Sequence, residues 1–335
     1  MKRVAVTGAS GHLGANLVRE LLGRGYRVVV LIRQTSLALE GLDVIRVSAD
    51  ISDRQSLCRA FRGVDQVYHL AACISIQGGD TKRLEAINVE GTANVIAACQ
   101  TEGVSTLIHF STIHALEREP MNQDFNEENP LIDDCKGSGG DYEKSKARAE
   151  VLVREISKGA LQTRIIYPTG VLGPNDFNLS LLGQAILRMA QGSLPALVTG
   201  GYDWVDARDV AWGSVEAAEK SGNGDRFILS GHYRSMSEVA AEIATHTGIA
   251  APRVVCPAWL AAWSATVMEA WSRWRGETPL YTRDSLAALS ANKVVSHSLA
   301  TAKLGYQPRS FEESIGDTLQ FYRDQKYLKV PGIGV

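Results

Sequence analysis

Thr7-Gly8-Ala9-Ser10-Gly11-His12-Leu13-Gly14 follows the apolar run Val4-Ala5-Val6 and opens a helical pattern near residues 13–24. Glycines at these places suit a tight turn from strand to helix, in which the backbone approaches a ligand closely and the helix packs on its strand. The free amide groups at the start of such a helix offer hydrogen-bond donors and partial positive charge to phosphate groups. We therefore expect a dinucleotide to contact the turn through Gly8, Ser10, Gly11, His12 and Leu13.

Short apolar segments alternate with helical patterns through the first half of the chain. The expected strands are residues 4–7, 28–32, 44–47, 66–70, 106–110 and 161–167, and the expected helices lie near 13–24, 53–62, 81–102 and 141–157. Apolar strands of about 4–8 residues that are joined by helices form parallel sheets covered on both faces. The sequence thus predicts an α/β fold, a doubly wound Rossmann sheet of about seven strands with a smaller, discontinuous, mostly helical substrate-binding region.

The order of these patterns indicates where the two parts lie along the chain. Residues 1–172 are expected to form the dinucleotide-binding domain, completed by about 203–230 and 290–310. Residues 173–202 and 231–290 are expected to form the substrate-binding region, and residues 311–335 a C-terminal helix and tail.

The composition restricts the compartment and the partners. The chain has 335 residues and a net charge of −2, which gives no reason to expect a nucleic-acid partner. Its five cysteines are scattered and form no Cys-x-x-Cys pair, so we expect neither a disulfide framework nor a metal site. These features favour a cytoplasmic protein.

The longest apolar stretch, residues 254–268, contains Pro257 and is shorter than the roughly 18–20 apolar residues that a membrane-spanning helix needs. No transmembrane segment is therefore expected. Trp259, Trp263, Trp271 and Trp274 recur close to helical spacing. They favour a packed helix of the substrate-binding region; the alternative is an aromatic wall for an apolar substrate or a contact with a membrane surface.

The end of the second expected strand distinguishes the two nicotinamide dinucleotides. Proteins that bind NAD usually have Asp or Glu there, about 20 residues after the glycines, whereas Arg suits the 2′-phosphate of NADP. This chain has Arg33 and Gln34 there and no carboxylate. Because Arg33 would form charge-assisted hydrogen bonds with a phosphate, NADP(H) is favoured; NAD(H) and a solvated surface arginine stay open. The segment Leu70-Ala71-Ala72 ends the fourth strand with small residues that let a cofactor lie against the sheet edge.

Tyr142 and Lys146 stand four residues apart in an expected helix, so they share one of its faces. A free tyrosine has a pKa of about 10, and bringing it near 7 takes roughly 4 kcal/mol of preferential stabilisation of the phenolate. A nearby ammonium supplies charge of the right sign. We therefore expect Lys146 to lower the pKa of Tyr142 and to hold the ribose of the cofactor.

Two hydroxyl groups, those of Ser111 and Thr112, follow the fifth expected strand. Either could bond a substrate oxygen at this edge of the sheet. Hydroxyl groups at a strand end often only cap the next turn, however, and that interpretation stays open.

With these motifs the chain closely resembles the extended short-chain dehydrogenase/reductase family. The resemblance covers almost the whole chain and includes residues 7–14, 67–72, 88–92, 142–146, 167–174, 206–211 and 303–308. It implies nicotinamide-dependent redox chemistry with Thr112, Tyr142 and Lys146 as the catalytic residues and Ser111 as the fallback for Thr112. It further implies that Asp50 and Ile51 clamp the adenine and that Pro168, Thr169, Gly170 and Val171 flank the nicotinamide. Family members often dimerise, so a homodimer stays open.

Two departures favour the branch of dihydroflavonol 4-reductases and 3-beta-hydroxysteroid dehydrogenases. Sugar-nucleotide dehydratases have Asp-Glu directly after the active Thr, where this chain has Ile113 and His114. Many epimerases have Phe-Asn before the Gly-Pro turn, where this chain has Pro168 and Thr169. His114 is a candidate for lining the substrate pocket.

These observations predict an NADP(H)-dependent oxidoreductase that reduces a ketone or aldehyde, or oxidises the alcohol, of a small apolar substrate. The alternative is a nucleotide-sugar epimerase with bound NAD. A third interpretation is a dinucleotide sensor without catalysis, although such a sensor typically lacks the tyrosine or the lysine.

Overall fold

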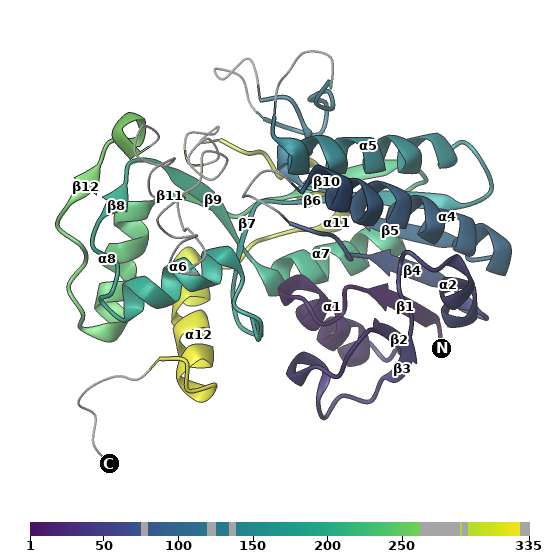
Figure 1. Ribbon diagram of the computed structural model, residues 1–335, viewed down its shortest axis with the longest axis horizontal. Helices are drawn as coiled ribbons and strands as arrows, with labels where there is room; N and C mark the ends of the chain where they lie inside the picture. Colours follow the sequence, from purple (N-terminus) through teal and green to yellow (C-terminus); the bar gives the residue numbers. More distant parts are fainter. Residues whose placement is uncertain (75–79, 119–124, 134–138, 262–288, 290–293, 329–335) are drawn as a thin grey trace.

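Seven parallel strands form the central sheet, in the order β10-β6-β5-β4-β1-β2-β3 (Figure 1). They are β1 Arg3–Thr7, β2 Arg27–Ile32, β3 Ile45–Ser48, β4 Gln66–His69, β5 Thr106–Phe110, β6 Gln162–Pro168 and β10 Asp225–Leu229. The computed structural model describes residues 1–74, 80–118, 125–133, 139–261, 289 and 294–328. The direction of strand order reverses between β1 and β4, which is where doubly wound sheets bind ligands.

Helices cover both faces of this sheet (Figure 1). One face packs its apolar side chains against α1 (His12–Gly23), α7 (Ala207–Lys220) and α11 (Ser298–Leu304). The other face packs against α2 (Arg54–Phe61), α4 (Gly91–Glu102) and α5 (Asp141–Ile156). The predicted Rossmann sheet is confirmed, and the central strands are apolar on both faces because helices cover both.

A smaller lobe adjoins the sheet (Figure 1). It contains a three-stranded sheet in the order β11-β9-β7, formed by β7 (Gly170–Leu172), β9 (Gly201–Asp206) and β11 (His232–Ser235). The short strands β8 (Leu197–Val198) and β12 (Val255–Cys256) pair with each other. Helices α6 (Leu181–Ala190), α8 (Met236–Thr247) and α12 (Phe311–Asp324) form one apolar cluster with residues of β7, β8, β9 and β12.

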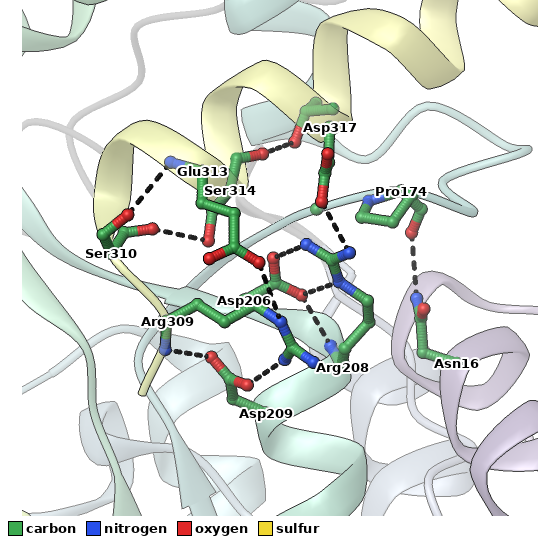
Figure 2. Close-up of polar contacts among 12 residues, drawn as sticks. Asn16, Pro174, Asp206, Arg208, Asp209, Arg309, Ser310, Glu313, Ser314 and Asp317 are labelled. Atoms are coloured by element: carbon green, nitrogen blue, oxygen red, sulfur yellow. Dashed lines mark hydrogen bonds and ion pairs between the residues drawn. The ribbon is translucent and has the colours of Figure 1, made fainter. Parts of the chain in front are cut away.

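Ion pairs join helix α7 to the C-terminal segment (Figure 2). Arg208 binds Asp206 at 2.7 Å and Asp317 of α12 at 2.6 Å. Asp209 accepts hydrogen bonds from the backbone amide and the guanidinium of Arg309. The sheet layer and the smaller lobe therefore share a polar contact as well as the covalent chain.

Within the described residues, no helix combines the length and the apolar character that a bilayer crossing requires. Of the four tryptophans with near-helical spacing, Trp259 is 73% exposed. Trp263, Trp271 and Trp274 lie outside the described residues.

The first turn of the fold leaves no room for side chains at two glycines. Gly8 has a φ of +69°, and a Cβ there would lie 2.7 Å from the backbone nitrogen of Ala71. A Cβ on Gly14 would lie 2.2 Å from the carbonyl oxygen of Gly8. Glycine is therefore required both for the turn and for the packing of α1 on it.

We predict that Gly14→Ala destabilises the protein by about 1–3 kcal/mol, because the backbone of β1 and α1 must separate to admit the methyl group. Urea unfolding measures this loss. Gly23→Ala is the control on the same helix, since a Cβ there meets nothing within 4 Å, and it should be neutral or stabilising by up to about 1 kcal/mol. Equal stability changes in the two variants would contradict the packing described here.

Candidate active site at the carboxyl edge of the sheet

The amino end of helix α1 is open to a ligand. Gly11 caps the helix without any side-chain hydrogen bond, and it is exposed. A Cβ on Gly11 would lie 3.4 Å from the carbonyl oxygen of Gly8 and within 4 Å of nothing else among the described residues. Ser10, His12 and Leu13 beside it are half-buried. This arrangement of glycines and uncapped helix fits a phosphate group.

The side chain of His12 connects this turn to the smaller lobe. Its Nε2 lies 3.1 Å from the carbonyl oxygens of both Gly173 and Pro174. Asn16 Nδ2 donates to the same Pro174 oxygen at 2.9 Å (Figure 2), and Asn178 Nδ2 donates to the carbonyl of Ser10 at 3.0 Å. These partners of the imidazole lie more than 150 positions away in the chain, so the spacing of residues near His12 does not indicate them.

The residues expected at the adenosine end follow β2 and β3, which are neighbours in the sheet. Arg33 is exposed directly after β2. Asp50 Oδ1 accepts hydrogen bonds from the amide and hydroxyl of Ser52, at 2.9 and 2.7 Å. These two hydrogen bonds lower the pKa of Asp50, and the charge of Arg33 lowers it by a smaller amount. Ile51 packs beside Gly91, whose Cβ would clash with it at 2.8 Å.

The segment after β4 lies across the end of β1. The amides of Leu70 and Ala71 each donate to Thr7 Oγ1 at 3.2 Å. Ala72 is exposed at this edge. His69 at the end of β4 is buried and contacts the hydroxyls of Thr7 and Thr92 at 2.8 and 3.0 Å, so it is a hydrogen-bonded core residue.

Lys146 is almost fully enclosed, with 4% of its surface exposed. Its Nζ donates a 2.6 Å hydrogen bond to the carbonyl of Phe110, the last residue of β5. Burial lowers the pKa of Lys146 to about 8, although the charge of Glu150 opposes that change.

Tyr142 lies one turn before Lys146 on α5. Burial raises the pKa of its phenol, and the charges of Glu143 and Cys73 raise it further. This differs from the expected lowering by Lys146. The physical reason is that the ammonium is bonded to the Phe110 carbonyl while burial dominates the energy of the phenolate. In the protein chain by itself, the phenol of Tyr142 is therefore protonated at neutral pH.

Ser111 and Thr112 differ in their surroundings. Thr112 is buried. Its Oγ1 accepts a 3.3 Å hydrogen bond from the amide of His114 and thereby caps the short turn at Ile113–Ala115. Among the described residues, the Thr112 hydroxyl donates to no acceptor. Ser111 Oγ donates to Glu150 Oε2 at 2.5 Å, so its proton is used inside the protein.

His114 lies beside the start of α5. Its Nδ1 is 2.6 Å from Arg118 Nη2, and the same Arg118 nitrogen binds Glu143 at 2.6 Å. Burial and the charge of Arg118 lower the pKa of His114 to about 3. The ring is therefore neutral and accepts a hydrogen bond from Arg118.

The segment after β6 borders the smaller lobe. Pro168 ends β6 and is buried, and Gly170 and Val171 begin β7. Between them, Thr169 Oγ1 donates to Asp203 Oδ1 at 2.7 Å. All the predicted segments follow the carboxyl ends of parallel strands or begin helix α5, so the fold brings them to one edge.

Asn88 is a residue that sequence reasoning did not select for the site. It is 2% exposed and lies in a π-helical segment, Glu85–Glu90, directly before α4. Its amide pairs with the backbone nitrogen and oxygen of Cys73 at 2.8 and 3.0 Å and donates to Ser145 Oγ at 2.9 Å. Asn88 thus connects the segment after β4 to the turn of α5 between Tyr142 and Lys146. Its place in the Asn88-Val89-Glu90-Gly91-Thr92 motif was the available signal.

In the part of the chain that the structure describes, no group of three or more His, Cys, Asp or Glu side chains is arranged to hold a metal ion.

Comparison with known proteins identifies the family. The sequence pattern of the NAD-dependent epimerase/dehydratase family matches residues 4–230. The chain belongs to this family. Sterol demethylase protein B of Methylococcus capsulatus is 34% identical over 96% of this chain and 98% of that protein. The putative dihydroflavonol 4-reductase of Synechocystis is 30% identical over 97% of this chain and 95% of that protein.

A 3-beta-hydroxysteroid dehydrogenase of Mycolicibacterium neoaurum is 27% identical over 96% of this chain and 92% of that protein. The crystal structure of gox2253 superposes with a TM-score of 0.85 at 30% identity, covering 98% of this chain and 100% of that one. The expected membership of the extended short-chain dehydrogenase/reductase family is confirmed, and this family member is an NAD(P)-dependent oxidoreductase.

We predict that Asn88→Ala lowers the free energy of unfolding by about 2–4 kcal/mol, since it leaves buried polar groups on two segments without partners. Asn94→Ala is the control on α4, where the side chain donates to the Ile51 carbonyl at 3.0 Å, and it should cost no more than about 1 kcal/mol. Urea unfolding of both variants measures the difference. An Asn88→Ala protein as stable as Asn94→Ala would rule out the connecting role.

Proposed function

We propose that this protein reduces a ketone or aldehyde of a lipophilic, sterol-like substrate with NADPH. The observation that carries the proposal is the pair of half-buried Tyr142 and buried Lys146, one turn apart on α5, at the same sheet edge as Thr112 and the open end of α1. Two relatives are named for sterol or steroid chemistry, which supports this substrate class.

The backbone and side chains along the edge would hold the dinucleotide. We assign this role to Gly8, Ser10, Gly11, His12, Leu13, Arg33, Asp50, Ile51, Leu70, Ala71, Ala72, Pro168, Thr169, Gly170 and Val171, together with Tyr142 and Lys146. The fit rests on the amino end of α1, where the exposed Gly11 makes no side-chain hydrogen bond to the first amide groups of the helix. The bound dinucleotide supplies the hydride.

The protein supplies the proton and the charge. Tyr142 donates its phenolic proton to the substrate oxygen, and its raised pKa keeps that proton in place at neutral pH. Thr112 donates its free hydroxyl proton as a hydrogen bond to the same oxygen. Lys146 stabilises the phenolate that forms, because an ammonium nearby favours the charged phenol. His114 is assigned to the substrate side of this group.

The cofactor preference is assigned to Arg33. It is exposed at the end of β2 and is close enough to Asp50 to lower the pKa of that carboxyl. A 2′-phosphate there would receive charge-assisted hydrogen bonds from the guanidinium.

We predict that a spectrophotometric screen of ketones, aldehydes, steroids and flavonoids detects net NADPH oxidation. Tyr142→Phe should lower kcat by about 10²–10⁴-fold because the proton donor is lost. Tyr26→Phe is the control, because the phenol of Tyr26 contacts Glu219 away from this edge, and this variant should retain activity.

We predict that turnover falls as the pH rises through about 8, because the ammonium of Lys146 is required and its pKa is about 8.

Interconversion of UDP- or GDP-sugars without consumption of NADPH would replace this proposal by epimerisation. Dinucleotide binding without any turnover, and unaffected by Tyr142→Phe, would indicate a sensor.

We predict that Arg33→Ala raises the Kd for NADPH by about 10–100-fold, which corresponds to the roughly 1.5–3 kcal/mol of a hydrogen bond to a charged group. The Kd for NADH should change little. Arg27→Ala, at the amino end of the same strand, should leave both values unchanged. Fluorescence titration provides the measurement, and equal losses for the two dinucleotides would contradict the assignment.

A further inference from the structure

One buried carboxylate lies behind the candidate active site. Glu150 is 0% exposed and stands on α5 one helical turn after Lys146, on the face that also presents Tyr142. An isolated buried carboxylate is costly, so its partners show what it is for.

Each oxygen of this carboxylate binds a different part of the fold. Oε2 accepts the hydrogen bond from Ser111 Oγ at 2.5 Å. Oε1 accepts from the phenol of Tyr167 and from the guanidinium of Arg154, at 2.8 Å for Nε. Arg154 also donates to the Tyr167 oxygen at 3.1 Å. The carboxylate therefore joins α5 to the ends of β5 and β6.

These partners are neighbours of residues assigned to the reaction. Ser111 directly precedes Thr112, and Tyr167 directly precedes Pro168. The backbone of Ser111 also donates to the carbonyl of Ile166 at 2.8 Å, which couples the two strand ends. A displacement of the Glu150 carboxylate would be transmitted to both segments.

Glu150 also acts on Lys146 through its charge. The groups that face Lys146 from β4 and β5 are His69 and His109, and burial lowers the pKa of both rings. Both are therefore neutral in the working range. The carboxylate of Glu150 raises the pKa of Lys146 against the effect of burial.

We propose that Glu150 is the positioning residue of this site. Its carboxylate fixes the ends of β5 and β6 against α5 and supplies the negative charge that keeps Lys146 an ammonium. This rests on the proposed function, in which Lys146 and Thr112 act on the reaction. Glu150 touches neither substrate nor dinucleotide in this role.

The test compares Glu150→Gln with Tyr167→Phe in the full-length enzyme, using a ketone that the screen identifies. Glu150→Gln keeps the shape and an oxygen for Ser111 but removes the charge. Tyr167→Phe removes a hydrogen bond and keeps the charge. In the pH profile of kcat/KM, the basic limb of Glu150→Gln should move to lower pH by about one unit, while that of Tyr167→Phe should stay in place. A limb that stays in place in Glu150→Gln, with activity lowered equally at every pH, would overturn the proposal.

A second measurement does not depend on turnover. A lysine with a lowered pKa in the folded state contributes stability that increases as the pH rises from that pKa toward the unfolded value of about 10.4. In Glu150→Gln this increase should begin at lower pH. The difference in Tm between wild type and Glu150→Gln should therefore shrink as the pH rises from about 7 to 8. A constant difference would also overturn the proposal.

The two failures are distinguishable. Unchanged turnover in Tyr142→Phe would remove the proposed function, while the thermal comparison would still decide whether Glu150 sets the charge of Lys146.

Discussion

The buried hydrogen bond from Lys146 Nζ to the carbonyl of Phe110 fixes helix α5 against the end of strand β5. An ammonium in this enclosed position needs a strong acceptor and a nearby negative charge, since burial of an unpaired charge is costly. The Phe110 carbonyl provides the acceptor and Glu150 the charge. Because Tyr142, Lys146 and Glu150 share one face of α5, this contact also holds the face that carries Tyr142 toward the end of β5.

The fold could be predicted from the sequence because its signals are local. Gly14 is required by a contact within its own turn, since a Cβ there would lie 2.2 Å from the carbonyl oxygen of Gly8, and the apolar strands are continuous because helices cover both faces. The interval 81–102, however, was expected as one helix. It contains α3 (Thr81–Leu84), a π-helical segment and α4, and an added residue in a helical turn leaves no clear mark in the apolar periodicity. The domain boundaries drawn from the sequence stay a prediction.

The candidate site was predictable only where a spacing carries chemistry. Tyr142 and Lys146 are recognisable because helical geometry places them on one face. The roles of Glu150, Asn88 and His12 could not be read in this way, since they depend on Ser111, Cys73 and Pro174, which lie 39, 15 and 162 positions away. The direction of the change in the pKa of Tyr142 was also not predictable, because burial depends on the segments packed around the phenol. The different uses of Ser111 and Thr112 likewise follow from Glu150, which only the fold brings to Ser111.

The structure of the protein crystallised with NADPH tests most directly whether this edge performs hydride transfer. The account predicts that the phosphates lie at the start of α1, that the phenol oxygen of Tyr142 faces C4 of the nicotinamide and that Lys146 Nζ lies within hydrogen-bonding distance of the ribose hydroxyls. A dinucleotide bound elsewhere, or one bound here with the phenol of Tyr142 turned away from C4, would contradict it.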